Sequence, residues 1–481
     1  MNKKVILGIL GRLAMIESGL MILPFIVSAI YKEWSSFQAF GITAAGALLF
    51  GIILTLLCKT KNRVIYAKDG FAIVAASWLT VSLIGALPFT ISGEMPNYIN
   101  AFFETVSGFT TTGASVLEDV EAMSHGMLFW RSFTHFIGGM GFLVFVMAIV
   151  PNISDRSMHI MRAEVPGPVV GKLVPRIKDT AKILYIIYFF MTVAEVILLL
   201  LGNMPLFDSL VLSFGSAGTG GFAIKADSIA SYSPYCQWII AIFMMLFGIN
   251  FNVYYLLLIR HFKSALKSSE MWCYIGIITA SSGIIAYNIF SKFGTVSKTV
   301  REAFFQVVSI MTTTGYATDN FDSWPVLSKS ILLLLMFIGA CAGSTGGGLK
   351  VSRVMLLVKI IKKEIKKLIH PHSVTTIKFD GKPVDKNTVT GISSYFAVYI
   401  FCFVVCLMLI SFENFDIETN FSAMASCFNN IGPGLAKVGP DLNFNLYSYF
   451  SKLVLSFAML LGRLEIYPML IFFSRSTWSK K

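Results

Sequence analysis

Ten apolar runs, each long enough to cross a lipid bilayer, restrict the fold of this 481-residue chain more than any other feature. About 20 apolar residues span the hydrocarbon core of a bilayer as a helix. The runs lie at residues 5–30, 38–58, 70–92, 126–150, 182–202, 235–259, 272–292, 328–358, 390–412 and 449–474. Only 14% of the residues are charged, against about 25% in soluble domains. We therefore expect an all-α integral membrane protein and exclude a soluble enzyme.

Four short segments between these runs end in similar glycine-containing clusters. The first and third share Thr-Thr-Thr-Gly, at residues 110–113 and 312–315, and looser copies lie at 218–221 and 429–432. In the second copy, two adjacent glycines leave the alignment open by one residue. Each segment is too short to cross, so the repeating unit is a helix, a half-helix, a glycine loop and a helix. The expected bounds are an N-terminal helix hairpin at 1–65 and repeats at 66–155, 156–265, 266–370 and 371–481.

The glycine loops have the chemistry of a site for a desolvated cation. Irregular backbone is tolerated within a membrane only where protein buries it or where it lines a watery cavity. Glycine permits positive φ, which lets carbonyl groups turn toward one axis, and a ring of carbonyls can replace the water shell of a monovalent cation. The predicted cation-binding residues are Thr111, Thr112, Gly113, Thr219, Gly220, Gly221, Thr313, Thr314, Gly315, Asn430, Ile431 and Gly432. Acids expected to attract cations to the outer mouth are Glu104, Glu118, Asp119, Glu121, Asp208, Asp319, Asp322 and Glu418.

The net charge of +13 is distributed unevenly between the loops. If the glycine loops face outward, most of the 39 Lys and Arg residues fall on the opposite side, with the densest block at 350–386. The positive-inside rule then places both termini in the cytosol. The charge thus reports orientation, and we expect no nucleic-acid partner. The basic block could be a solvated helix near lipid or a dock for an acidic or nucleotide-binding regulator. Because Arg12 and Glu17 interrupt the first apolar run, we expect a retained helix rather than a cleaved signal.

Four joined helix, pore-loop, helix units with Thr-Thr-Thr-Gly, Gly-Gly-Phe, Thr-Thr-Thr-Gly-Tyr and Asn-Asn-Ile-Gly-Pro-Gly resemble the TrkH/KtrB family of bacterial potassium-uptake subunits, and its TrkH members most. The resemblance covers essentially the whole chain. It implies a pseudo-fourfold pore in the bacterial inner membrane, with potassium as the transported ion bound in the filter and no covalent cofactor. Gly113, where a serine accompanies sodium permeation, implies potassium selectivity. The resemblance also implies a homodimer and a cytosolic TrkA-type subunit that binds NAD or ATP.

The eighth apolar run contains a glycine-rich segment at 339–348 that should break its helix, since each glycine costs about 1 kcal/mol relative to alanine. No Gly-Lys-Ser/Thr follows and no strand precedes it, which argues against a phosphate-binding loop. Close packing of helices through small residues is one reading. The family resemblance implies instead a gate below the filter. The implied gate residues are Gly339, Gly343, Gly346, Gly347, Gly348, Lys350 and Arg463.

Arg463 lies in the last apolar run, where a charge is costly and faces a partner or a water-filled cavity. Pairing with Glu465 is disfavoured because residues two apart on a helix point to different sides. Pairing with Glu195 stays open. The resemblance implies that Arg463 lies in the pore as an electrostatic barrier to cations.

Together these features predict a potassium-selective, channel-like transporter. A symporter coupled to protons or sodium remains the alternative. Carriers built from inverted repeats are disfavoured because all four loops keep one orientation. The chain contains no His-Glu-x-x-His and no Gly-x-Ser-x-Gly, so we do not expect an enzyme. His135, beside Gly138 and Gly139, is interpreted as a helix-packing residue.

Overall fold

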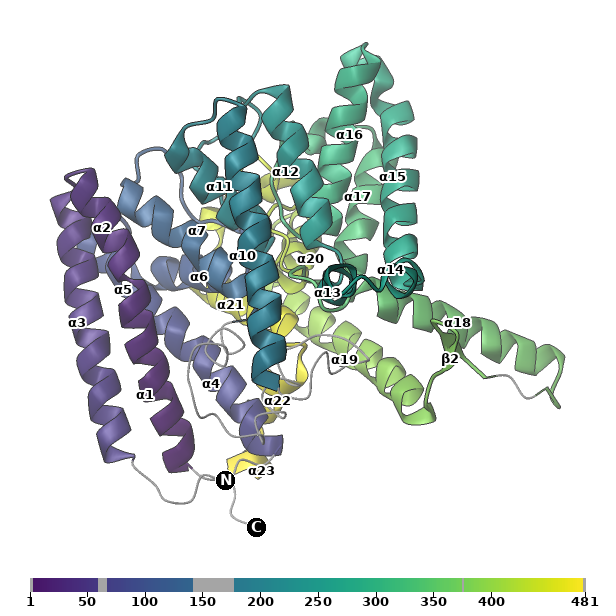
Figure 1. Ribbon diagram of the computed structural model, residues 1–481, viewed down its shortest axis with the longest axis horizontal. Coiled ribbons are helices and arrows are strands. Elements are labelled where there is room, and N and C mark those ends of the chain that lie inside the picture. Colours follow the sequence, from purple (N-terminus) through teal and green to yellow (C-terminus); the bar gives the residue numbers. More distant parts are fainter. Residues whose placement is uncertain (1–2, 59–66, 142–176, 374–375, 479–481) are drawn as a thin grey trace.

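Helices dominate the fold (Figure 1). The structure, a computed structural model, describes four stretches of the chain: residues 3–58, 67–141, 177–373 and 376–478. In these stretches the only strands form one antiparallel pair, β1 (Lys378–Phe379) and β2 (Lys382–Pro383). The expected all-helical class is therefore confirmed.

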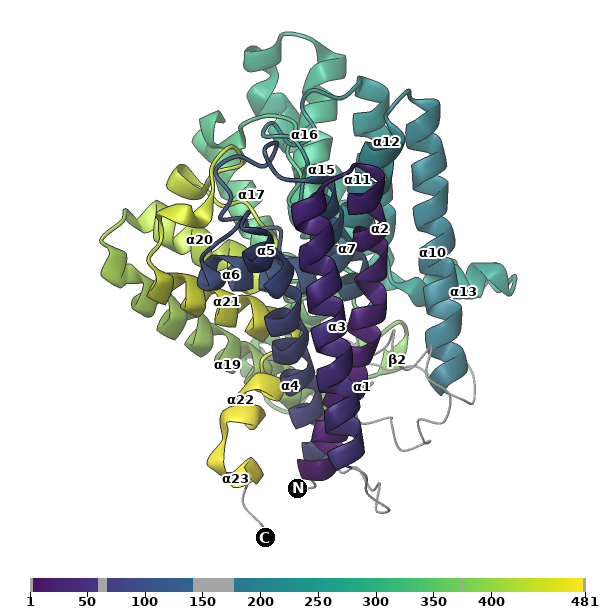
Figure 2. The same cartoon turned by 90° about the vertical axis from the view of Figure 1, so that its left-hand side faces the viewer.

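A hairpin of helices lies along one side of the molecule (Figures 1 and 2). Its members are α1 (Lys3–Leu20), α2 (Ile22–Ile30) and α3 (Trp34–Leu57). α1 and α3 come into close contact at Gly11 and Gly51, since a Cβ on Gly51 would lie 2.5 Å from the carbonyl oxygen of Gly11. Small residues allow membrane helices to pack backbone against backbone. The other face of α3 exposes large apolar side chains, as contact with lipid requires.

After the hairpin the chain alternates between long helices and short, buried ones. The long helices are α4 (Ala67–Gly85), which is continued by α5 (Leu87–Ser92), α10 (Ile177–Leu201), α15 (Ser269–Phe293) and α19 (Lys386–Ile410). The short helices, here called pore helices, are α6 (Tyr98–Phe109), α11 (Leu206–Gly218), α16 (Val296–Met311) and α20 (Ile417–Asn429). Asn97 and Asp416 cap α6 and α20 by accepting hydrogen bonds from backbone N–H groups of the first turn. The last turn of each pore helix is buried, so these helices end inside the protein.

Each pore helix is followed by a loop and then by a helix that stops early. These helices are α7 (His125–Gly139), α12 (Pro234–Phe247), α17 (Val326–Ile338) and α21 (Tyr449–Arg463). Their continuations are α13 (Phe251–Leu258), which bends by 89° from α12, α18 (Val351–Ile369) after α17, and α22 (Tyr467–Phe473) after α21. The break between α17 and α18 confirms the interruption predicted from the glycine-rich segment.

The ten apolar runs do not each form one continuous helix. In the described residues six helices are long and apolar enough to cross a bilayer, and the bent pair of α12 and α13 makes a seventh. The run at 449–474 is not one helix, because the chain turns at Glu465 and Ile466, both with positive φ (56° and 65°). The end of the run at 126–150, from residue 142 onward, lies outside the described residues.

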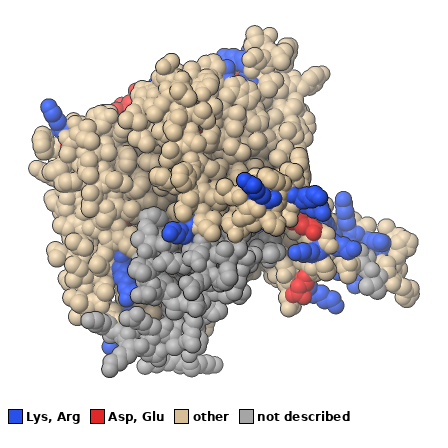
Figure 3. Space-filling view, in the orientation of Figure 1, with Lys and Arg blue, Asp and Glu red and all other residues tan. Residues whose placement is uncertain are grey.

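Basic side chains gather where α14 (Phe262–Leu266) and α18 lie, on the part of the molecule that extends away from the main body (Figures 1 and 3). Lys362, Lys366 and Lys367 are exposed there. The remaining short elements are α23 (Arg475–Trp478) and the 3-10 turns η2 (Phe321–Ser323), η3 (Ser411–Glu413), η4 (Ala436–Val438) and η5 (Phe444–Leu446).

Candidate functional site

The four glycine loops, at residues 110–113, 218–221, 312–315 and 429–432, repeat one backbone path. The second residue of each loop has a left-handed conformation, and so does the fourth. The second residues are Thr111, Thr219, Thr313 and Asn430, with φ of 54°, 55°, 59° and 58°. The fourth residues are Gly113, Gly221, Gly315 and Gly432, with φ of 80°, 73°, 88° and 108°. This pattern aligns Gly221, rather than Gly220, with the other three glycines.

The four loops form a closed ring, here called the glycine ring. The fourth residue of each loop lies against the carbonyl of the third residue of the next loop, too closely for any side chain. The distances from an added Cβ to that oxygen are Gly113 to Gly220 (2.0 Å), Gly221 to Thr314 (2.0 Å), Gly315 to Ile431 (2.0 Å) and Gly432 to Thr112 (2.8 Å). The fourth loop thus returns to the first. All twelve predicted cation-binding residues lie in this ring.

One cavity of about 150 Å³ opens on the glycine ring, and the fourth residues of all four loops line it. Its charged lining is mixed. Glu118 and Asp441 contribute acidic groups, while Arg131 and Lys225 contribute basic ones. The four pore helices therefore end near one cavity. The C-terminal end of a helix carries a partial negative charge, which favours a cation there.

On the cytosolic side in the expected orientation, the segment between α17 and α18 lies against the glycine ring. This segment, residues 339–350, is here called the inner loop. The backbone N–H of Gly347 donates to Oγ1 of Thr313 across 2.6 Å. A Cβ on Gly347 would lie 2.4 Å from the carbonyl oxygen of Asn429, and one on Gly346 would lie 2.9 Å from that of Thr312. The inner loop therefore covers the third and fourth glycine loops directly.

Buried polar groups hold the inner loop in place. Oε1 of Glu270, on α15, accepts from the backbone N–H groups of Ala342 (2.7 Å) and Ser352 (3.0 Å). The ammonium of Lys350, only 3% exposed, donates to the carbonyl of Gly346. Because the inner loop is not helical, its backbone groups need such partners within the membrane.

Arg463, at the end of α21, joins the inner loop to α7. Its guanidinium donates to the carbonyl oxygens of Thr345 (2.9 Å) and Gly139 (2.6 Å), and also to that of Gly138. Glu465 instead pairs with Arg353 (2.5 Å). Glu195 accepts a hydrogen bond from Ser216 (2.5 Å). The predicted gate residues thus come together below the glycine ring.

The model of the TrkH family, described as a cation transport protein, matches residues 36–279 and 287–480. The chain belongs to the TrkH family. The Trk system potassium uptake protein TrkH of Salmonella typhimurium is 37% identical over 99% of this chain and 100% of its own. The Trk system potassium uptake protein TrkG of Escherichia coli is 32% identical over 99% of this chain and 98% of its own.

The fold agrees with that assignment. The crystal structure of the potassium transporter TrkH from Vibrio parahaemolyticus superposes with a TM-score of 0.90, at 32% identity and with full coverage of both chains. These relatives are transport proteins by name, which confirms that this TrkH-family chain is not an enzyme.

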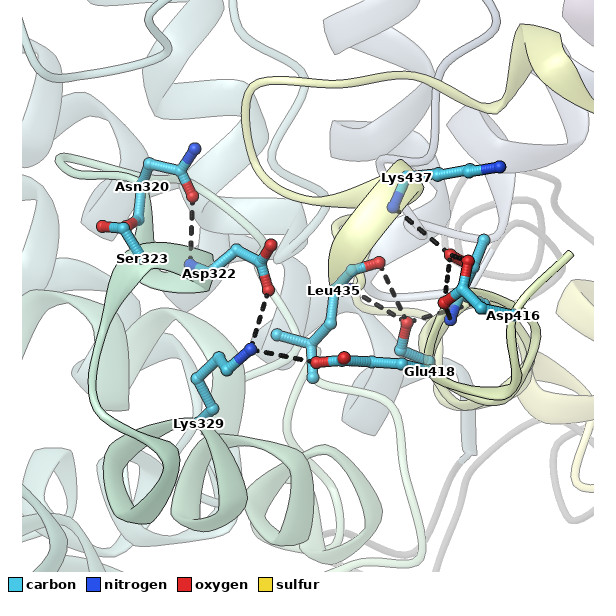
Figure 4. Close-up of polar contacts among 10 residues, drawn as sticks. Asn320, Asp322, Ser323, Lys329, Asp416, Glu418, Leu435 and Lys437 are labelled. Carbon is cyan, nitrogen blue, oxygen red and sulfur yellow. Dashed lines mark hydrogen bonds and ion pairs between the residues drawn. The ribbon is translucent and has the colours of Figure 1, made fainter.

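The acids that were expected at the mouth differ in their surroundings. Glu104 is 1% exposed and pairs with Arg131 across 2.7 Å, so its assignment to the mouth was wrong. Others lie at the surface in ion pairs. Lys329 contacts both Asp322 (3.4 Å) and Glu418 (3.0 Å), joining the loop after the third glycine loop to α20 (Figure 4).

A third acid in the same region, Asp416, caps the N-terminal end of α20 (Figure 4). Asp416 accepts from the backbone N–H of Thr419 (2.9 Å) and from its hydroxyl (2.8 Å). These hydrogen bonds stabilise the carboxylate and lower the pKa of Asp416. The start of this pore helix therefore keeps a negative charge, which complements the helix dipole.

Several site residues were not predicted from the sequence. Arg131 on α7 is 3% exposed, and its guanidinium lies 4.0 Å from the ring centre of Phe222, which follows the second glycine loop. Its partner Glu104 also accepts from the backbone N–H of Val116 (3.0 Å). His135 does more than pack helices, because its ring bonds to Gly108 at the end of α6 and to Phe222 directly after the second glycine loop. A charged residue within a short apolar helix was the signal available for Arg131.

Proposed function

We propose that this chain is a potassium-selective, channel-like transporter for potassium uptake, with the ion passing through the glycine ring. The observation that carries the proposal is the closed ring of four equivalent loops, in which the glycine of each loop lies against the third-residue carbonyl of the next loop. Backbone carbonyls arranged around an axis can replace the hydration shell of potassium. The Salmonella typhimurium and Escherichia coli relatives, which match essentially the whole chain, are potassium uptake proteins by name. The bound ions would be held by residues 111–113, 219–221, 313–315 and 430–432.

The proposed architecture is a pseudo-fourfold pore built from four helix, pore-loop, helix repeats. The repeats are 66–155, 156–265, 266–370 and 371–481, after the hairpin at 1–65. The recurrence of a long helix, a pore helix, a glycine loop and an interrupted helix supports this division. The first boundary, near residue 65, and the second, near residue 155, lie outside the described residues.

The proposed gate is the inner loop together with Arg463. Gly347 contacts both the third and the fourth glycine loop, so an ion leaving the ring on this side would meet the inner loop. Arg463 and Lys350 add two positive charges there, which oppose a cation electrostatically. Movement of the inner loop would remove both the obstruction and the hydrogen bond between Arg463 and Thr345.

We further propose that the protein lies in the bacterial inner membrane as a homodimer, with both termini and the basic helix α18 in the cytosol. Exposed Lys362, Lys366 and Lys367 on α18 would face an acidic surface of a cytosolic regulatory subunit of the TrkA type, which binds NAD or ATP. The basic character of this protruding helix supports an inner location under the positive-inside rule (Figure 3).

Flux through liposomes tests the proposal. The purified chain is reconstituted with a potassium gradient, and uptake is compared with that driven by an equal sodium gradient. Potassium uptake down its own gradient, with little sodium uptake, is the expected result. Uptake that stops when proton and sodium gradients are abolished would identify a coupled symporter instead. Equal uptake of both ions would contradict potassium selectivity.

A further inference from the structure

Two of the glycine loops are supported from behind by a pair of threonine hydroxyls. In the first loop the Oγ1 atoms of Thr110 and Thr112 lie 2.8 Å apart, and Thr110 also donates to the carbonyl of Val106. In the third loop Thr312 and Thr314 make the same 2.8 Å contact. All of these hydroxyls are buried, so the hydrogen bonds connect each loop to its own pore helix.

The second glycine loop lacks both threonines and has Gly218 and Gly220 in their places. His135, from α7, occupies the vacated space. A Cβ on Gly220 would lie 2.3 Å from both Cγ and Nδ1 of the His135 ring, and a Cβ on Gly218 would lie 2.3 Å from the His135 carbonyl oxygen. The two glycines are therefore required by the approach of His135, and His135 itself is fully buried.

Both ring nitrogens of His135 are engaged, one by the pore helix α6 and the other by the residue that follows the second glycine loop. Nδ1 lies 2.7 Å from the carbonyl oxygen of Gly108, just before the first glycine loop, so Nδ1 must carry a proton. The backbone N–H of Phe222 donates to Nε2 across 3.3 Å, so Nε2 must offer a lone pair. These two bonds require a neutral imidazole in a single tautomer.

The hydrogen bond between His135 and Phe222 lies next to the glycine ring. Phe222 directly follows Gly221, and its ring centre lies 4.3 Å from that of His135 and 4.0 Å from the Arg131 guanidinium. Because the N–H of Phe222 belongs to the peptide whose carbonyl is that of Gly221, the hydrogen bond to Nε2 fixes the orientation of that carbonyl.

We propose that His135 is a positioning residue for the second glycine loop, replacing the threonine pair and setting the direction of the Gly221 carbonyl. The proposal rests on the potassium selectivity proposed above and adds a residue that determines it. The donor bond to Gly108 holds His135 against α6, the pore helix that precedes the first loop. The acceptor bond to Phe222 then sets the position of the residue that follows the second loop.

Two amide variants separate the bonds. Asparagine can place its NH₂ near the position of Nδ1, and glutamine can place its carbonyl oxygen near that of Nε2. We expect His135→Gln to keep the potassium-over-sodium flux ratio close to wild type. His135→Asn should lower that ratio by about three- to tenfold, as expected for one lost hydrogen bond. The matched control is His125, which is 43% exposed, where neither substitution should change the ratio.

Glycine substitutions give a second measurement that does not depend on how the histidine variants fold. Gly220→Ala would press a methyl group into the imidazole, so it should lower the flux ratio at least as much as His135→Asn. Gly276→Ala on α15, where nothing lies within 4 Å of the added Cβ, should have no effect.

The outcomes separate this proposal from the proposed pore. Three results would each overturn the role of His135. The first is an equal flux ratio in the asparagine, glutamine and wild-type proteins, and the second is an equal loss of that ratio in both amide variants. The third is an unchanged flux ratio in Gly220→Ala. Gly113→Ser, measured in parallel, reports on the pore itself. If Gly113→Ser also left the ratio unchanged, the proposed filter would be wrong as well.

Discussion

The backbone N–H of Gly347 donates directly to the side-chain hydroxyl of Thr313, so the inner loop and the third glycine loop share a hydrogen bond of 2.6 Å. Both residues are buried. This bond therefore joins the proposed gate to the proposed filter. The third glycine loop and the proposed gate are thus in direct contact, with no third residue between them.

Replacing Thr313 with valine tests that contact. Valine keeps the shape of threonine but cannot accept a hydrogen bond, and a buried N–H left without a partner costs about 1–3 kcal/mol. We expect Thr313→Val to weaken closure and raise potassium flux about fivefold or more without a regulatory subunit. Thr111→Val is the matched control, because Oγ1 of Thr111 has no hydrogen-bond partner among the described residues. Equal flux in the two variants would argue against the coupling.

Removing the obstruction should have a larger effect. Deletion of residues 342–347 removes the segment beneath the glycine ring, and Arg463→Ala removes a positive charge together with its hydrogen bonds to Thr345 and Gly139. Both should raise potassium flux in liposomes, while Arg463→Lys, which keeps the charge, should raise it less. If folded samples of the deletion and alanine variants transport no faster than wild type, the gate assignment fails.

Gly113→Ser should reduce selectivity. The added Cβ would lie 2.0 Å from the carbonyl oxygen of Gly220 at a backbone φ of 80°, so the first and second loops must both shift. We expect sodium flux to rise relative to potassium flux, measured with each ion alone. Gly283→Ser on α15, where the added side chain meets open space, provides the control. An unchanged ratio in Gly113→Ser would count against the assigned filter.

The buried ion pair between Glu104 and Arg131 should contribute more to stability than the surface pairs of Lys329. Glu104→Gln leaves Arg131 buried without its counter-charge, and breaking such a pair costs about 3–5 kcal/mol. Lys329→Ala breaks exposed pairs worth about 0–1 kcal/mol. Thermal unfolding in detergent should therefore show a clear drop in midpoint for Glu104→Gln and little change for Lys329→Ala. Similar midpoints would contradict this ranking.

Features that depend on a short stretch of sequence were predictable. The two Thr-Thr-Thr-Gly copies predicted the first and third glycine loops, and the glycines between 339 and 348 predicted the break before α18. The break after Arg463 was missed, although Pro468 gave a signal, since proline cannot continue a helix interior.

The remaining site features depend on contacts between distant segments. From the sequence alone, Glu104 cannot be told from the acids at the outer surface. Only its contact with Arg131, 27 residues away, shows that it is buried. His135 likewise lies 87 residues from Phe222, and no periodicity relates them. The second loop appeared irregular because its supporting group comes from another part of the chain.

The closed ring has a consequence for how such a protein can vary. In a tetramer of identical subunits, every substitution appears four times around the axis, so a change that one quadrant would tolerate is imposed on all. Here the four loops of the ring belong to one chain, so each loop can be substituted separately. Threonine pairs lie in two of the loops while a histidine lies against a third, so in the proposed filter each quarter of the ring can be changed without the others.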